Sequence, residues 1–168
     1  MEDINNSVNS VEIRKAVHGD GERIIALLEQ IGEYHHNGRP DIFKSGIKKY
    51  NLDHLIEILD NPQRITFSAA DKTTGEILGY ALCEILTYKN HPIFNDMMTF
   101  YIDDICVDEK CRGQGIGFLL VEKCKEYAKE TGCYNIDLNV WEFNQSAIKF
   151  YEKCGLVVQR RKLEFILI

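Results

Sequence analysis

Residues 107–120 read Val-Asp-Glu-Lys-Cys-Arg-Gly-Gln-Gly-Ile-Gly-Phe-Leu-Leu. A strand-like stretch leads in, three glycines alternate at positions 113, 115 and 117, and a helical apolar pattern leads out. Glycine lets backbone N–H groups point outward and lets a bulky group come close. A helix N-terminus adds a partial positive charge, and Lys110 and Arg112 add full ones. This order of strand, glycine loop and helix predicts a cradle for a phosphate-like anion.

Two better-known phosphate cradles do not match this loop. The P-loop requires Gly-Lys-Ser/Thr at the helix start, whereas Gly117 is followed by Phe118. The dinucleotide fingerprint requires Gly-x-Gly-x-x-Gly, whereas these glycines are spaced two and two. A glycine-rich turn without any ligand stays open on these residues alone.

The rest of the chain predicts an α/β fold, because strand and helix patterns alternate after residue 115 and such alternation requires a parallel strand pair. Strands are expected at residues 11–17, 65–70, 77–86, 99–107, 135–140, 156–158 and 163–167. Helices are expected at residues 24–31, 52–59, 116–129 and 146–153, and residues 34–41 are expected to break the first of them. The prediction is a mixed, mostly antiparallel seven-stranded sheet flanked by about four helices.

Length and charge limit the classes of protein to which the chain can belong. The 168 residues carry 20 Lys and Arg against 26 Asp and Glu, a formal charge of −6. We expect a flexible tail at residues 1–10 and a single domain at 11–168. A net negative chain without a basic run argues against nucleic acid, and no apolar stretch is long enough for a membrane span. The start is not a signal peptide, so we expect a cytoplasmic protein.

The six cysteines form no Cys-x-x-Cys pair and lie near no histidine at zinc-finger spacing. They are expected to be reduced, mostly buried thiols, with no metal site.

Two acids interrupt an otherwise apolar strand at Asp103 and Asp104. Burying a carboxylate is costly unless it has a partner. In a regular strand the two side chains face opposite ways, so at most one faces a cleft unless a bulge intervenes. Glu84, on the neighbouring predicted strand, is a third candidate. The plain alternative is that one Asp caps a loop or pairs with an arginine.

A second pattern lies on the helix predicted after Asn144, which is a good N-cap residue. Tyr151 falls on the same face as Ala147 and Ile148, and Gly155 suits the helix end. Taken alone, Tyr151 reads as a half-buried aromatic.

Together the glycine loop and the tyrosine helix resemble the GCN5-related N-acetyltransferase (GNAT) superfamily. The superfamily's Arg/Gln-x-x-Gly-x-Gly/Ala pattern matches residues 112–117, and its Asn, Ala, Phe-Tyr, Gly-Phe pattern matches Asn144, Ala147, Phe150-Tyr151 and Gly155-Leu156. Leu156 replaces the common Phe, a conservative departure. The resemblance covers roughly residues 11–167 and implies that the parallel strands splay apart.

The resemblance implies acetyl-coenzyme A as co-substrate and no metal. Its pyrophosphate would lie in the glycine loop, its pantetheine arm would pair with a strand backbone, and a helix start would flank it. The cofactor-binding residues implied are Ile105, Cys106, Val107, Arg112, Gly113, Gln114, Gly115, Ile116, Gly117, Phe118, Asn144, Gln145, Ser146 and Tyr151.

By the same resemblance Tyr151 is the general acid that protonates the leaving thiolate, and Asp103 is the base, with Asp104 and Glu84 as second choices. The first helices and the loop between them would form the acceptor wall, which implicates Tyr34, His35, Arg39 and Phe43.

The partner is an amine acceptor, either a polyamine, an aminoglycoside or a protein amine. A non-catalytic acyl-coenzyme A sensor and an interaction module with a vestigial loop remain alternatives. A homodimer is an expectation from the resemblance alone, and nothing in the sequence locates an interface.

Overall fold

The computed structural model describes residues 10–167, so most of the predicted N-terminal tail lies outside the described residues. The strands within this range are β1 (Val11–Lys15), β2 (Arg64–Asp71), β3 (Ile77–Tyr88), β4 (Met97–Val107) and β5 (Asn135–Leu138). The helices are α2 (Gly21–Gly38), α3 (Leu52–Asp60), α4 (Ile116–Glu130) and α5 (Gln145–Lys153), with short 3-10 turns η1 (His18–Asp20) and η2 (Glu109–Cys111). The predicted α/β class is confirmed.

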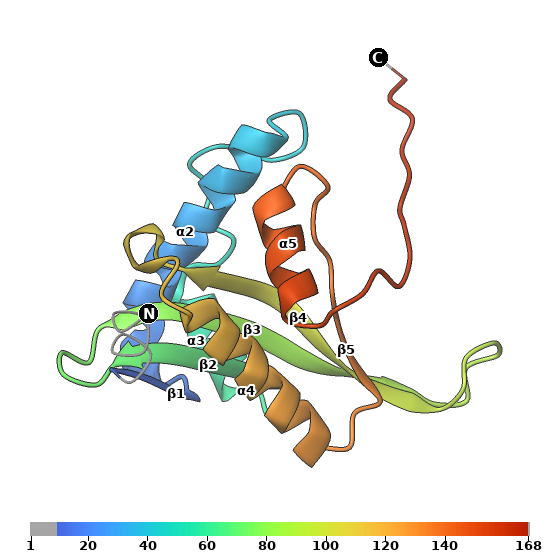
Figure 1. Cartoon of the computed structure of the whole chain (residues 1–168), viewed down its shortest axis with the longest axis horizontal. Helices are drawn as coiled ribbons and strands as arrows, with labels where there is room; N and C mark the ends of the chain where they lie inside the picture. The colour runs from blue at the N-terminus through green and yellow to red at the C-terminus, as the bar shows by residue number, and fades with distance from the viewer. Residues whose placement is uncertain (1–9, 168) are drawn as a thin grey trace.

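The strands form one sheet in the order β1-β2-β3-β4-β5 (Figure 1). The first four pair antiparallel, and β5 pairs parallel to β4 after the α4 crossover. Residues 10–167 therefore contain five strands, not the seven expected. The missing pair was predicted at 156–158 and 163–167, where the chain leaves the domain as an extended segment instead.

Two apolar layers cover the two faces of the sheet. On one face α4 packs against β1, β2, β3 and β4. On the other face α2 and α3 pack against Tyr80, Leu82 and Cys106. Since neighbouring strand residues point to opposite faces, this arrangement explains why β2 and β3 each contain a continuous run of buried residues.

The first long helix runs further than predicted. α2 continues through Tyr34, His35 and His36 to Gly38, so the break expected at residues 34–41 is wrong in its first half. Aromatic and histidine side chains are acceptable in a helix when they pack, and His35 stacks on Phe43 with ring centroids 5.1 Å apart. No helix in residues 10–167 is both long and apolar enough to cross a lipid bilayer.

Candidate functional site

The glycine loop connects β4 to α4 through two left-handed residues. Gly113 has φ 77° and Gly115 has φ 83°, a region that side-chain-bearing residues adopt at a cost. A Cβ added at Gly113 would meet nothing within 4 Å. Gly115 is also the N-cap of α4 and offers no side-chain hydrogen bond to the helix. The first-turn amides of α4 are therefore left without a side-chain cap, which is the geometry that fits a phosphate group.

Gly117 serves a different purpose from the two glycines before it. A Cβ at this position would lie 3.2 Å from Cζ of Phe150. The missing side chain therefore lets α4 and α5 approach closely. The alternating glycine pattern suggested anion binding for all three glycines and did not indicate this packing role.

Two residues of α2 hold the loop in place. The Gln30 amide nitrogen donates to the Val107 carbonyl at 3.2 Å, and its oxygen accepts from the Glu109 N–H at 3.2 Å. Arg23 forms an ion pair with Asp108, whose carboxylate also accepts from the Lys110 N–H at 2.8 Å. Sequence reasoning missed both residues, because they lie about 80 positions before the loop. The apolar pattern of their helix predicted which residues are buried, but it gave no role to the polar ones.

Strands β4 and β5 separate before β4 ends. The parallel register runs from Thr99 with Asn135 to Ile102 with Leu138, where β5 stops. The N–H of Asp108 donates to Leu78 of β3 at 2.8 Å, and backbone groups alternate sides along a strand. The amides of Ile105 and Val107 therefore face the open side. The predicted strand to residue 140 is two residues too long, and the splay that the resemblance implied is present.

A β-bulge in β4 brings the two acids together. The register with β3 pairs Leu82 with Asp104 but Cys83 with Ile102, which leaves Asp103 as the extra residue. As a result, Nζ of Lys49 lies 3.1 Å from Oδ2 of Asp103 and 3.3 Å from Oδ2 of Asp104. Both carboxylates therefore reach the same cation on the α2–α3 side of the sheet.

The two carboxylates have different surroundings. The Asp104 side chain is 11% exposed and accepts a hydrogen bond from the Tyr80 hydroxyl at 2.9 Å. Burial raises the pKa of Asp104, and the charge of Lys49 works against that increase. Asp103 is 23% exposed and accepts from the Tyr50 hydroxyl at 3.4 Å. Burial of Asp104 thus favours the protonated form of its carboxyl group.

Glu84, the third predicted acid, is connected to this pair through an arginine. Arg64 lies 3.1 Å from Glu84 and 3.9 Å from Asp103. Glu84 and Arg64 also line a cavity of about 410 Å³ at the end of β3.

Tyr151 lies on α5 and is partly buried. Burial raises the pKa of its phenol, and the charge of Asp104 raises it further. The pKa of Cys106 is raised to about 12, again chiefly by burial. Both groups therefore stay protonated at neutral pH, so Tyr151 can donate a proton and Cys106 is a poor nucleophile.

An aromatic wall borders the acids, formed by Tyr34 and His35 of α2, Phe43 of the following loop, and Trp141 and Phe143 of the β5–α5 connection. Ring centroids are 5.1 Å apart for His35 and Phe43, 5.1 Å for Phe43 and Trp141, and 6.2 Å for Trp141 and Phe143. Burial lowers the pKa of His35, which keeps its ring neutral near pH 7. Sequence reasoning found the first three residues and missed the two on the connection.

The start of α5 is tied to the same wall. Oδ1 of Asn144 accepts hydrogen bonds from the Ala147 N–H at 3.1 Å, the Ser146 hydroxyl at 3.0 Å and the Tyr34 hydroxyl at 3.2 Å. Asn144 is therefore the N-cap, as predicted. Gln145 donates to the Glu142 carbonyl at 2.7 Å, and Arg39 pairs with Asp41 and Glu164 rather than with the acids.

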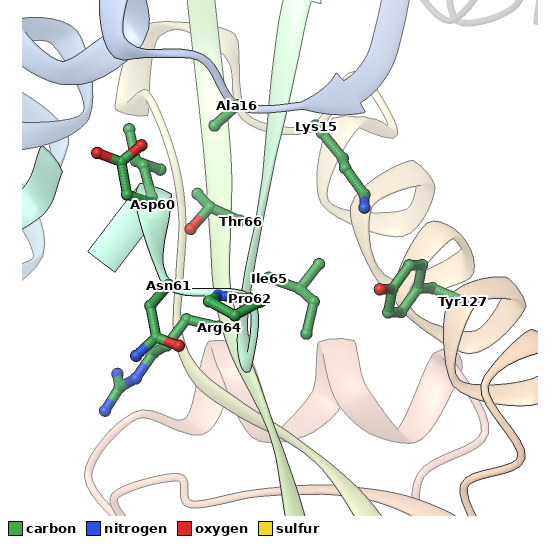
Figure 2. A pocket seen from close by; sticks show the side chains of 10 residues that line it. Lys15, Ala16, Asp60, Asn61, Pro62, Arg64, Ile65, Thr66 and Tyr127 are labelled. Carbon is green, nitrogen blue, oxygen red and sulfur yellow. The ribbon is translucent and has the colours of Figure 1, made fainter. Parts of the chain in front are cut away.

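Another pocket shares Arg64 with the surroundings of the acids. Figure 2 shows it between the end of β1, the end of α3 and Tyr127 of α4. Its volume is about 150 Å³. The Thr66 hydroxyl at its wall is buried without a hydrogen-bond partner among residues 10–167. None of its lining residues belongs to the glycine loop or the acid pair.

Comparisons with known proteins agree with this geometry. The model of the acetyltransferase (GNAT) family matches residues 28–156. A thialysine N-epsilon-acetyltransferase of Sus scrofa is 27% identical over 154 residues, covering 87% of this chain and 84% of the relative. A probable glucosamine 6-phosphate N-acetyltransferase 2 of Oryza sativa subsp. japonica is 37% identical over 156 residues, covering 88% and 82%.

Solved structures share the fold. A mutant of the BH1408 protein from Bacillus halodurans superposes with a TM-score of 0.89 at 30% identity, covering 94% of this chain and 99% of that one. The aminoglycoside acetyltransferase meta-AAC0020 from an uncultured soil metagenomic sample has a TM-score of 0.73 at 19% identity, covering 95% and 97%, a likeness of fold alone.

Proposed function

Because the chain belongs to the acetyltransferase (GNAT) family and is therefore an acyltransferase, we propose that it moves an acetyl group from acetyl-coenzyme A to a primary amine by direct attack. The observation that carries the proposal is the open glycine loop at the splayed end of β4. Left-handed Gly113 leaves open space for a diphosphate, and Gly115 leaves the start of α4 without a side-chain cap. Acetyl-coenzyme A, when bound, supplies an acyl thioester that an amine can attack.

The backbone next to the loop suits the pantetheine arm. The amides of Ile105 and Val107 face the gap left by β5, so an amide-bearing chain can bond there as another strand does. Gln30 and Arg112 already donate hydrogen bonds to the Val107 carbonyl. The other outward-facing backbone groups of Ile105 and Val107 are therefore left for the pantetheine arm. The remaining loop residues, Gln114 to Phe118, and the α5 start at Asn144 to Ser146 flank the same path.

We assign the proton that the amine loses to Asp104. A lysine-like amine has a pKa near 10.4, so it arrives protonated at neutral pH. The raised pKa of Asp104 and its contact with the Lys49 ammonium show a carboxyl that already binds a cationic nitrogen. Asp103, which the resemblance favoured, holds the same cation from the more exposed side and helps to position the amine. Glu84 is connected to the acid pair through Arg64.

Tyr151 is proposed to return a proton to the leaving sulfur. Coenzyme A leaves as a thiolate with a pKa near that of cysteine, about 8.5. A phenol whose pKa is raised by burial keeps its proton at neutral pH and can transfer it to that thiolate. Holding both reactants in one cleft contributes about 7–11 kcal/mol more.

The proposed acceptor is a cationic primary amine, whether polyamine-like, aminoglycoside-like or part of a protein. The acid pair attracts positive charge, and the aromatic wall offers apolar and cation–π contacts to the aliphatic part of such an acceptor. Relatives named for thialysine and ornithine acetylation support an amine of this type.

Thiol release from acetyl-coenzyme A tests the function directly. We expect release that depends on an added amine in a panel of polyamines, aminoglycosides, lysine derivatives and peptides. Gly115→Glu fills the loop and should abolish release. Acetyl-coenzyme A binding without release across the whole panel would replace the transferase by a sensor.

A further inference from the structure

A lysine of this chain lies where the proposed reaction needs an acceptor amine. Nζ of Lys49 donates hydrogen bonds to Oδ2 of both Asp103 and Asp104. The same ammonium group lies 5.4 Å from the centre of the Tyr50 ring, which is within cation–π distance. A lysine side chain ends in a primary alkyl amine, the class of acceptor proposed above. The site therefore holds an amine of the required chemistry within its own chain.

The contact with Asp104 places this amine beside the proposed path of the thioester. Asp104 is followed directly by Ile105, whose amide faces the gap in which the pantetheine arm is proposed to lie. Burial raises the pKa of the Tyr151 phenol, and the charge of Asp104 adds to that increase, so the proposed base and acid act on each other across the site. The nitrogen that Asp104 holds therefore lies on the side from which an acyl carbon between base and acid is attacked.

The backbone that carries Lys49 is weakly anchored, so its side chain can adjust toward a bound acyl group. Residues 44–49 belong to the connection between α2 and α3 and are all exposed. The hydroxyl of Ser45 and the N–H of Gly46 donate to the carboxylate of Glu33 on the exposed surface. Exposed contacts to a charged group stabilise little, and a segment held by them is among the first to open locally.

We propose that the chain acetylates its own Lys49 at Nζ when acetyl-coenzyme A is bound and no acceptor amine is present. This inference rests on the proposed function, because it uses the same donor, base and acid. Asp104 takes one proton from the ammonium group and passes it to water, and the nitrogen lone pair forms an N–C bond to the acetyl carbonyl. The C–S bond breaks and the sulfur receives the proton of Tyr151, whose phenol is restored by the second amine proton. The products are an acetylated Lys49 and free coenzyme A.

Acetylation removes the cation from the acid pair. An acetylated lysine is neutral and has one N–H in place of three, so it no longer compensates two carboxylates. The modification therefore leaves Asp103 and Asp104 free for a cationic acceptor. Because an acceptor and Lys49 compete for the same carboxylates, saturating amine should protect Lys49 from acetylation.

Intact mass and peptide mapping test the modification without an activity assay. After incubation with acetyl-coenzyme A alone, the purified chain should carry one acetyl group, located on Lys49. Lys48 is the internal control, because its side chain is 52% exposed against 39% for Lys49, so uncatalysed acetylation from solution would favour Lys48. An unmodified Lys49, or acetylation of Lys48 at the same rate, would overturn the proposal.

Three variants test the route of the transfer. Lys49→Arg keeps the positive charge but accepts no acetyl group, so this variant should keep its original mass. Tyr151→Phe should slow acetylation of Lys49 by about 10²-fold or more, whereas Tyr134→Phe, at a tyrosine that is 79% exposed, should leave the rate unchanged. Because the transfer is made within one chain, its first-order rate constant should not depend on protein concentration. A full rate in Tyr151→Phe, or a rate constant that rises with protein concentration, would contradict this route.

Thiol release with the amine panel separates this inference from the proposed function. Amine-dependent release while Lys49 stays unmodified would remove the self-acetylation and leave the transferase. Protection of Lys49 by saturating amine supports a shared position, whereas equal acetylation with and without amine would exclude one. Absence of both thiol release and acetylation of Lys49 would remove the proposed function as well.

Discussion

Lys49 holds its ammonium group 3.1 Å from Asp103 and 3.3 Å from Asp104, two neighbours in sequence that a regular strand would point to opposite faces. The bulge between the Leu82 and Cys83 pairings makes this possible. Although burial alone would lower it, the two carboxylates raise the pKa of Lys49. The lysine therefore stays charged and occupies the position where we propose that an acceptor amine binds.

Removing this cation should shift the pH dependence of the reaction. A carboxylate base works only when it is deprotonated, so activity is lost as pH falls through the pKa of Asp104. The charge of Lys49 lowers that pKa. Lys49→Met should therefore move the acidic limb of the kcat/KM profile to higher pH.

Lys48→Met is the control for this change. Lys48 pairs with Glu29 at 3.7 Å on an exposed surface, so its loss should leave the profile in place. An acidic limb that stays at the same pH in Lys49→Met would remove Asp104 from the role of base.

The glycine loop can be tested with two equally strained positions. Gly113 has φ 77° and Gly75, in the turn between β2 and β3, has φ 74°, and a Cβ at either would meet nothing within 4 Å. Alanine should reduce the unfolding free energy by about 1–2 kcal/mol at each position. Only Gly113→Ala should weaken acetyl-coenzyme A binding in calorimetry. Equal affinities for the two variants would contradict the cradle.

Tyr151→Phe should separate binding from turnover. The loss of a positioned proton donor reduces kcat by about 10²-fold or more, while the buried ring and the affinity for acetyl-coenzyme A are retained. Tyr134→Phe, at a tyrosine that is 79% exposed, should change neither quantity. Full turnover by Tyr151→Phe would end the assignment of Tyr151 as the acid.

Local pattern predicted most of the elements because their burial repeats with a simple period. β2, β3, α3 and α4 begin and end within two residues of the expected positions. The glycine loop and the Asn144 cap were also readable, since backbone conformation dictates those residue types.

The remaining parts depend on contacts distant in sequence. The alternation of side chains along a regular strand does not predict the bulge at Asp103. One extra residue moves every later side chain of the strand to the other face of the sheet. Lys49 and Trp141 lie on connections, so only the packed fold brings them to the site. The apolar stretches of residues 156–167 have a strand-like composition, but they pair with no strand among residues 10–167. A sequence pattern predicts a strand without saying which other strand will pair with it.

The aromatic wall gives the last prediction, at the end of α2. A Cβ at Gly38 would lie 2.2 Å from Cε2 of Phe143, so Gly38→Ala must push this ring out of the wall. We expect a higher KM for the amine acceptor with unchanged affinity for acetyl-coenzyme A. The clash should also reduce the unfolding free energy by about 1–3 kcal/mol, against the gain of about 1 kcal/mol that alanine usually brings to a helix. Gly19→Ala, where a Cβ would meet nothing within 4 Å, is the control, and an acceptor KM that is the same in both variants would show that Phe143 does not contact the acceptor.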